Sequence, residues 1–423
     1  MPCCHPLRLL ALGVSVVLGV AGPAAAAITA GVPDALSPEP LERAALVAMP
    51  AVWQVQVTTR MRALRTKNGT IISLPPGARE VSRVGTAFAV TPTGYLVTAS
   101  HVVHPSAADL ARAAYLTYLV ITGKPHSERI AARWVDANDA TPVGVGSVQR
   151  VVRPTVAGPA ARAEHAVASP VVVTTDELRD IAVLHVPGLR NAPSLGLDRG
   201  FDHGTPIAAL GFGDTDPFAG SRRGALVPSV RLGVIGQTGG SGGDSPQVLT
   251  PISNDVQRGD SGGPAVDAYG RVRGALLVTR AEGGGAMVPT EELLRVLDRA
   301  NVRGSEGSSQ FLYRAALERV AYFDLTGARA DLQRTLTAYP AHGLAAYEIA
   351  RLDDLGGARL ALAGRPWYRE GLVAAAITAL VIATFLGVLL WKAVNRRPDG
   401  LRPRDRTVPF DQDDGPDDPH HLT

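Results

Sequence analysis

Cysteine is almost absent from this chain: 423 residues contain only Cys3 and Cys4, both at the very start. They precede a short apolar run, residues 9–20, which ends in the small residues 24–27. A basic start, a short apolar core and a small-residue exit are typical of a secretory signal peptide, and the run is too short to cross a bilayer comfortably. We therefore expect residues 1–27 to be removed. Without thiols, the mature chain would have no disulfides, no thiol catalysis and no cysteine-based zinc site.

Lysine is also scarce, with three copies, and charged residues make up only 19% of the chain. The formal net charge is +3, and no basic stretch is interleaved with aromatic residues. These features argue against nucleic-acid binding. Hydrophobic residues reach 46%, which excludes a chain that is disordered throughout.

One long hydrophobic run stands near the C-terminus. Residues 371–391 carry no charge, and at 1.5 Å per residue such a helix crosses a hydrocarbon core of about 30 Å. Basic residues are more frequent after it than before it, so the positive-inside rule places the C-terminus in the cytoplasm. We expect a transmembrane helix within 365–391 and a disordered cytoplasmic tail over 392–423.

Between the two ends, the apolar pattern changes once. Residues 28–45 are rich in Pro, Ala and Ser and are expected to form a linker. From there to about residue 290, short apolar runs alternate with Gly, Pro, Asp and Asn, which predicts an all-β barrel or sandwich. An insertion is expected within 105–168.

After residue 300 the apolar spacing is helical, and Tyr339-Pro340 interrupts it. The segment 308–356 resembles one to one and a half tetratricopeptide-type helix pairs, within a helical region over 301–364. Because fewer than three such repeats rarely stand alone, these helices are expected to pack on the rest of the protein, on the membrane or on a protein partner. A simple helical stalk is the alternative.

Three short motifs carry the residue types of acyl transfer. A strand-like run ends in His101, Asp180 opens a buried strand, and Ser261 lies in the Gly-rich turn 259–264. A serine hydroxyl becomes a nucleophile when a neutral imidazole takes its proton, and a buried carboxylate fixes the tautomer of that imidazole. Glycines allow backbone N–H groups to turn toward a developing oxyanion.

Together these motifs resemble a trypsin-like (chymotrypsin-fold) serine protease, nearest to the bacterial Deg/HtrA type but without a PDZ-like segment. The matching residues are Gly85–Phe88, Thr98–Val103, Asp180–Ala182, Gly259–Pro264 and Gly285–Pro289. The resemblance covers residues 46–300. It implies a mainly β domain of two β-barrels with the site in the cleft between them.

By motif position, the resemblance makes His101 the general base, Asp180 its orienting carboxylate and Ser261 the nucleophile. The backbone N–H groups of Gly259 and Ser261 would form the oxyanion hole.

Other residues compete for these roles: His104, Asp176, His185, Ser241 and Ser245. Each lacks one part of the motif. For example, only Asp180 directly opens the Ile-Ala strand, and the two serines lie in a Gly-rich loop without the nucleophile turn.

Asp255 lies six residues before Ser261. In trypsins, an acidic residue at that offset lies at the base of the specificity pocket, which suggests a preference for Arg or Lys at P1. The alternative is that Asp255 is an exposed loop residue.

The sequence thus predicts a membrane-anchored, extracytoplasmic serine endopeptidase that acts on exported or envelope proteins and needs no metal or cofactor. The main alternative is a latent protease-fold sensor or scaffold that binds a protein partner and signals across the membrane. An esterase is a third possibility, although the chain order Ser, Asp, His of the usual esterase elbow is reversed here.

Overall fold

The computed structural model describes residues 40–154, 167–213, 226–236, 249–278, 285–322 and 324–363. The chain divides into two compact units, residues 1–353 and 354–423. The site and the sheets belong to the first unit. The predicted signal peptide, the apolar segment 371–391 and the tail lie outside the described residues. Within the part that is described, no helix combines the length and apolar character needed to span a membrane.

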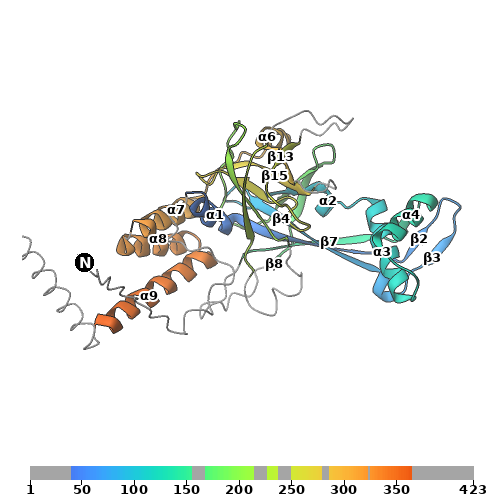
Figure 1. Ribbon diagram of the computed structural model, residues 1–423, viewed down its shortest axis with the longest axis horizontal. Helices are drawn as coiled ribbons and strands as arrows, with labels where there is room; N and C mark the ends of the chain where they lie inside the picture. The colour runs from blue at the N-terminus through green and yellow to red at the C-terminus, as the bar shows by residue number, and fades with distance from the viewer. Residues whose placement is uncertain are drawn as a thin grey trace, which may run out of the picture. The chain divides into compact units, whose positions relative to one another are not determined.

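Two curled antiparallel sheets form the body of the first unit (Figure 1). The first sheet has the strand order β8-β7-β1-β4-β5-β10-β9. Its strands are β1 (Val52–Arg60), β4 (Glu80–Ala89), β5 (Tyr95–Ala99), β7 (Gly146–Val152), β8 (Val167–Ala168), β9 (Val171–Asp176) and β10 (Ile181–His185).

The second sheet has the order β12-β11-β14-β15-β16-β13. An isolated bridge between Ile235 and Ile252 joins its two edges, so this sheet curls back on itself. Its strands are β11 (Pro206–Gly211), β12 (Ser229–Val234), β13 (Thr250–Ile252), β14 (Pro264–Val266), β15 (Val272–Val278) and β16 (Gly285–Pro289). The mainly β class with two curled half-barrels is confirmed.

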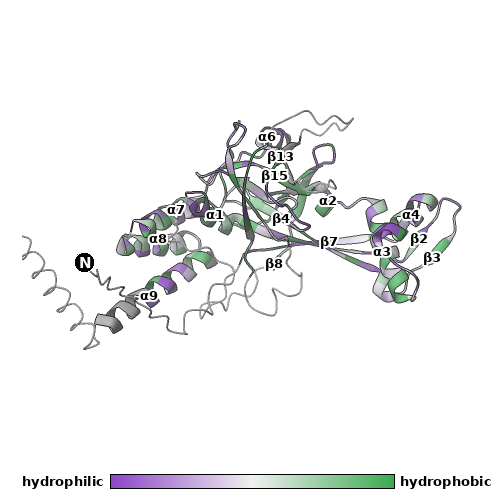
Figure 2. Ribbon diagram, viewed as in Figure 1, coloured by the Kyte–Doolittle hydropathy of each residue, from purple (hydrophilic) through white to green (hydrophobic). Residues whose placement is uncertain are grey.

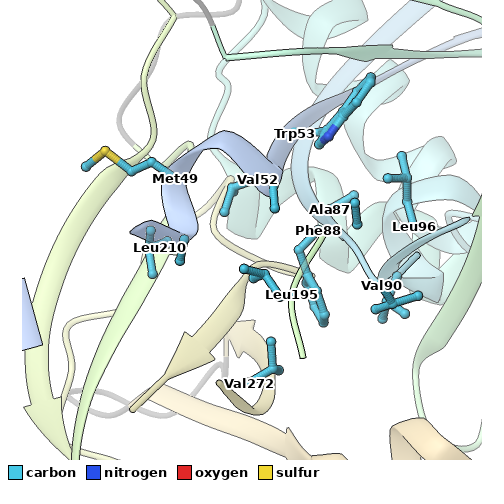
Figure 3. Packing of buried hydrophobic residues seen from close by; sticks show 14 of the residues in the cluster. Met49, Val52, Trp53, Ala87, Phe88, Val90, Leu96, Leu195, Leu210 and Val272 are labelled. Carbon is cyan, nitrogen blue, oxygen red and sulfur yellow. The ribbon is translucent and has the colours of Figure 1, made fainter. Parts of the chain in front are cut away.

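One apolar core connects the two sheets. Figure 3 shows Trp53, Phe88 and Leu96 of the first sheet packed in one cluster with Leu210 and Val272 of the second. All five are almost completely buried. Burial of each large side chain contributes about 1.5–3 kcal/mol, so this shared core is what fixes one sheet against the other. In Figure 2 the ribbon around β4 is accordingly coloured as mainly hydrophobic.

A small α/β module projects from the first sheet. Beyond the barrel, β1 and β4 stay paired as far as Arg60 and Glu80, and the chain then enters a three-stranded sheet. That sheet comprises β2 (Ala63–Arg65), β3 (Ile71–Ser73) and β6 (Thr141–Val143), and a core of its own packs it against the helices. The helices are α3 (Ala107–Ile121) and α4 (Glu128–Asn138), each begun by a serine cap, with the short 3-10 turn η2 (Pro76–Ala78) beside them.

The residues of this module differ from the predicted insertion at both ends. Residues 61–79 belong to the module although they precede the His101 motif, because β2 pairs with β6. Strands β7 and β8, which fall inside the predicted insertion 105–168, belong instead to the first sheet, because β7 pairs with β1 along its length.

The predicted linker is also wrong over its last residues. Helix α1 (Pro40–Ala48) begins at Pro40, which a first helical turn tolerates, and residues 44–48 are buried against the second sheet and α7. The alanines in this stretch, which suggested a linker, lie on the buried face of the helix. The 3-10 turn η1 (Met49–Ala51) then leads into β1.

The C-terminal helical region is confirmed. It comprises α7 (Ser308–Ala321), α8 (Leu325–Ala338) and α9 (Gly343–Ala363). Two further helices precede it in the chain: α2 (Ser100–Val103), after β5, and α6 (Thr290–Arg299), after β16. The break at Tyr339-Pro340 lies between α8 and α9, as the sequence indicates. Buried residues of α7 and α8, such as Tyr313 and Leu332, belong to the same core as the two sheets.

His342 caps α9 from a fully buried position. Its Nδ1 accepts a hydrogen bond from the backbone N–H of Ala345, and its Nε2 has no hydrogen-bond partner in the described residues. Burial lowers the pKa of His342 from 6.5 to about 3. The ring also lines a cavity of about 10 Å³ together with Trp53.

We therefore predict that the protein loses stability as the pH falls below 6.5. Between pH 6.5 and about 3, the unfolded chain binds a proton at this ring that the folded chain does not bind. The free energy of unfolding then falls with pH across that window, by several kcal/mol in order of magnitude at its lower end. Urea unfolding, followed by tryptophan fluorescence, measures the effect.

His342→Asn is the matched variant, since asparagine keeps the capping acceptor but does not titrate. We expect the pH dependence to be clearly weaker in this variant. Equal pH dependence in the two proteins would refute the role of His342.

Candidate active site

His101 is held at the junction of β5 and α2, in the second position of that short helix. The helix packs closely on β4. A Cβ added to Gly85 would lie 2.5 Å from Cγ1 of Val102, so only glycine at this position lets α2 approach. The imidazole is left partly open, with 42% of its side chain exposed, as a base that must meet a substrate requires.

Strand pairing brings Asp180 to His101 although 79 residues separate them. Strand β10 pairs antiparallel with β5, and Ile181 lies opposite Ala99. Asp180 directly precedes Ile181, and Ser100 directly follows Ala99, so these two residues also lie opposite each other. The N–H of Ser100 donates to the carbonyl of Asp180 over 3.0 Å. Asp180 adopts φ +54°, a left-handed conformation that aspartate tolerates better than most residues.

The carboxylate of Asp180 holds His101 at two points. Oδ2 lies 2.6 Å from Nδ1 of the ring, and Oδ1 accepts the backbone N–H of His101 over 2.9 Å. Two contacts fix both the position and the tautomer of the imidazole. Nε2 then becomes the nitrogen that can accept a proton.

Ser261 lies in a turn whose backbone depends on glycine. Gly259 has φ +103° and Gly262 has φ +85°. A Cβ on Gly259 would lie 2.7 Å from the carbonyl oxygen of Phe212, and one on Gly262 would lie 2.4 Å from that of Thr86. Ser261 itself is 4% exposed.

The backbone N–H groups of this turn fall into two sets. Those of Asp260, Gly262 and Gly263 donate to the carbonyls of Gln257, Leu276 and Asp260, respectively. Among the described residues, the N–H groups of Gly259 and Ser261 have no acceptor. These are the two donors that the sequence predicts for an oxyanion hole.

Thr86 fastens this turn to the first sheet, a contact that sequence reasoning did not assign. Its Oγ1 donates to the carbonyl of Gly259 over 2.6 Å and accepts the N–H of Phe212 over 3.0 Å. Its N–H donates to the carbonyl of Ser261 over 3.0 Å. The threonine stands in the quoted motif Gly85–Phe88, but its partners lie more than 120 residues away, and only the fold reveals them.

Ser261 and His101 are not hydrogen-bonded to each other. Among the described residues, Oγ of Ser261 receives one hydrogen bond, from the backbone N–H of Val278 at 3.3 Å. Catalytic hydrogen bonds are often long before substrate binds, so this geometry is compatible with a catalytic role for the two residues.

An ionic cluster around two buried carboxylates supports the loop that carries Asp180. The N–H of Arg179 donates to Oδ1 of Asp176 over 2.9 Å, and its guanidinium bonds both Asp176 and Glu292 of α6. Arg299 of α6 also bonds Asp176. Burial raises the pKa of the Asp176 carboxyl, but hydrogen bonds from Arg299 and Arg179 outweigh this effect and hold that pKa below its ordinary value.

The competing residues take other positions. His104 ends α2, and His185 stacks on Tyr95 with ring centroids 4.4 Å apart. Asp176 is hydrogen-bonded to Arg179 and Arg299. Ser241 and Ser245 lie outside the described residues.

Asp255 lies at the surface, where its Oδ2 accepts a hydrogen bond from Nε2 of Gln257 over 3.0 Å. The neighbouring residue, Val256, is the one that packs inward: a Cβ on Gly285 would lie 2.4 Å from Cγ2 of Val256. This arrangement favours the exposed-loop interpretation of Asp255 over a charged pocket base.

The α/β module also reaches the turn that carries Ser261. Arg258, next to Gly259, forms a two-point ion pair with Glu128 at the start of α4, at 2.9 and 3.2 Å. Both side chains are exposed, so the pair contributes at most about 1 kcal/mol. Arg83 of β4 lies close enough to Arg258 and Asp109 for both to influence it: burial lowers its pKa, Asp109 opposes this effect and Arg258 adds to it.

One family model matches the part of the chain that carries this site. The family model of the trypsin-like peptidase domain matches residues 85–274, a range that includes His101, Asp180 and Ser261. This part of the chain is therefore similar to trypsin-like peptidase domains. No curated protein sequence matches the chain.

Among solved structures, the chain is similar to the serine endoprotease from Yersinia pestis. The two share 17% sequence identity with a TM-score of 0.36, over 62% of this chain and 66% of that one. The chain thus spans just under two thirds of the length of that protein.

The contact between Gly85 and Val102 gives a test of how His101 is positioned. We predict that Gly85→Ala displaces α2, lowers the free energy of unfolding by about 1–3 kcal/mol and slows labelling of the protein by a serine-reactive phosphonate. The control is Gly146→Ala on β7, because a Cβ there meets nothing within 4 Å. Equal behaviour of the two variants in urea unfolding and in labelling would contradict the packing argument.

Proposed function

We propose that this chain is a serine endopeptidase in which His101, Asp180 and Ser261 form the catalytic triad. The observation that carries the proposal is the pairing of Nδ1 of His101 with Asp180 at 2.6 Å, in a segment that matches the family model of the trypsin-like peptidase domain. The Ser261 turn supports the same reading, because two of its N–H groups have no acceptor among the residues that the structure describes.

In the proposed mechanism, each step of acyl transfer is assigned to one group of this site. Oγ of Ser261 attacks the peptide carbonyl carbon while Nε2 of His101 takes the hydroxyl proton. Asp180 stabilises the imidazolium that forms, and the N–H groups of Gly259 and Ser261 stabilise the oxyanion, each donor lowering the barrier by about 3–4 kcal/mol. His101 then gives its proton to the leaving amine, and the acyl-enzyme is hydrolysed by water that His101 activates.

We further propose that the peptidase domain lies outside the cytoplasm and is anchored to the cell membrane. This part of the proposal rests on the sequence: a signal-type segment over 1–27 and an uncharged run over 371–391 with basic residues after it. Its substrates would be exported or envelope proteins. Helices α7–α9 would offer a surface for a protein partner.

One observation favours a second candidate, a latent protease-fold sensor. Oγ of Ser261 is hydrogen-bonded by Val278 and not by His101. In this candidate, a partner bound elsewhere would be needed to bring the serine to the imidazole.

The triad is tested with the full chain in detergent, a fluorescent phosphonate probe and unfolded casein. We predict that Ser261→Ala abolishes labelling, and that His101→Ala and Asp180→Asn each slow casein cleavage by about 10³-fold or more. If the folded wild-type chain is neither labelled nor active, the sensor becomes the better account. If Ser261→Ala is still labelled, the nucleophile has been misassigned.

A second prediction concerns P1 specificity. Because Asp255 is exposed and Val256 packs on Gly285, we expect small or apolar P1 residues to be cleaved about tenfold faster than Arg or Lys. Asp255→Asn should leave the ranking of a P1-varied peptide panel unchanged. A preference for Arg or Lys that disappears in Asp255→Asn would restore the pocket hypothesis.

A further inference from the structure

A groove of about 430 Å³ lies where three elements of the first unit meet. Its walls are α1, the turn between β14 and β15, and α7, and Figure 1 shows α1 beside α7. The volume falls within the range of natural ligand pockets, about 300–1,000 Å³. Its lining includes none of His101, Asp180 and Ser261, so the groove is separate from the candidate active site.

Hydrogen bonds fix the walls of the groove to each other. The buried carboxylate of Asp267 accepts the N–H groups of Tyr269 and Arg271 over 2.8 and 3.0 Å, which sets the shape of the β14–β15 turn. Nη1 of Arg314 on α7 donates to the carbonyl of Tyr269 over 2.9 Å and so joins the turn to the helix. A ligand would therefore meet a surface that is already formed, which lowers the entropy cost of binding.

Exposed aromatic rings gather at this groove. Of the large hydrophobic residues that are exposed in the described part of the chain, the three most exposed are Tyr322 at 84%, Tyr269 at 75% and Phe311 at 64%. The two tyrosines line the groove. Phe311 precedes Arg314, another lining residue, by three positions, so both lie on the same face of α7. Exposed apolar patches mark interaction sites, and tyrosine is enriched where binding energy concentrates.

The charged residues that line the groove are mainly basic. They are Arg43 on α1, Arg271 on the turn, and Arg314 and Glu318 on α7. Three cations stand against one anion, which favours a ligand that carries carboxylates. The single Glu318 disfavours a ligand with negative charge along its whole length, such as a nucleic acid.

Arg271 can release its present partner at little cost. Its Nη1 lies 3.3 Å from Oδ2 of Asp198, and the Arg271 side chain is 57% exposed, so this pair is weak. Arg273 also pairs with the same oxygen of Asp198, at 3.0 Å. Asp198 therefore keeps a cationic partner when Arg271 turns to a ligand. Arg314 is held more firmly, by Glu306 and by the turn.

We propose that this groove binds an acidic peptide segment of a protein partner. Carboxylates of the peptide pair with Arg271 and Arg43, and a neighbouring apolar side chain packs against Tyr269 and Tyr322. The inference rests on the part of the proposed function that assigns a partner surface to α7–α9, and it narrows that surface to one groove. It does not depend on Ser261 being a nucleophile.

The experiment uses the full chain in detergent as its Ser261→Ala variant, so that bound peptides stay uncut. The probes are fluorescein-labelled peptides of about 12 residues that contain Leu, Gly and Ser and carry Glu, Gln or Lys at the same three positions. By fluorescence anisotropy, we expect the Glu set to bind about tenfold more tightly than the Gln set, and the Lys set not to bind. Binding of the Glu set should weaken as NaCl is raised from about 50 to about 500 mM.

Two substitutions in the groove test its residues. We expect Arg271→Glu and Tyr322→Ala each to weaken binding of the Glu set by about tenfold, and Arg271→Lys by less than about threefold. The matched controls are Arg60→Glu, which makes the same charge change at an exposed ion pair with Glu80, and Ile71→Ala, which removes an exposed apolar side chain of the α/β module. Both controls should bind as the parent does, and thermal unfolding checks that every variant is folded.

Several results would overturn the inference. One is equal or absent binding of the Glu and Gln sets, and another is an equal loss in Arg271→Glu and Arg60→Glu. A short single-stranded DNA that binds as tightly as the Glu set would also do so, because the groove would then attract any anion. Phosphonate labelling of the wild-type chain tests the proposed peptidase separately, so an unlabelled chain that still binds the Glu set would refute the peptidase and leave the groove.

Discussion

The junction at Thr86 is the contact on which the geometry of the site depends. His101 and Asp180 belong to the first sheet, whereas the turn that carries Ser261 belongs to the second. The hydroxyl and amide of this fully buried threonine hold the carbonyls of Gly259 and Ser261, and its own carbonyl accepts the hydroxyl of Thr98. The shared apolar core keeps the sheets together, but apolar contacts are not directional and do not set how the sheets are aligned. The hydrogen bonds of Thr86 give the interface its register.

Arginine–carboxylate pairs then stiffen each half of the site. In the first half, Arg179 and Arg299 hold Asp176, which fixes the turn that presents Asp180. In the second half, Arg231 holds Asp260 beside Ser261. A chain with only three lysines is suited to this use, because the planar guanidinium can bond two acceptors at once and remains charged when buried. The net stability that such pairs add is small, because removing the charges from water offsets much of their attraction.

The sequence predicts much of this arrangement because its signals are local. Short motifs name His101, Asp180 and Ser261, alternating apolar runs predict the sheets, and Tyr339-Pro340 marks a helix break. What it could not predict depends on pairing between distant segments. The module is built from residues 61–79 and 105–143, which meet only because β2 pairs with β6. The contacts of Thr86 and the partner of Asp260 are likewise decided by the fold, and the buried face of α1 is hidden in an Ala-rich stretch that composition alone assigns to a linker.

The central claim is that one oxyanion would be bound by both N–H groups of the serine turn. A crystal structure of the full chain with a peptide phosphonate bound covalently tests it most directly. The account predicts a bond from Oγ of Ser261 to phosphorus. It also predicts one phosphonate oxygen within about 2.7–3.1 Å of the backbone nitrogens of both Gly259 and Ser261. A phosphonate attached to another residue, or an oxygen that points away from both nitrogens, would contradict it.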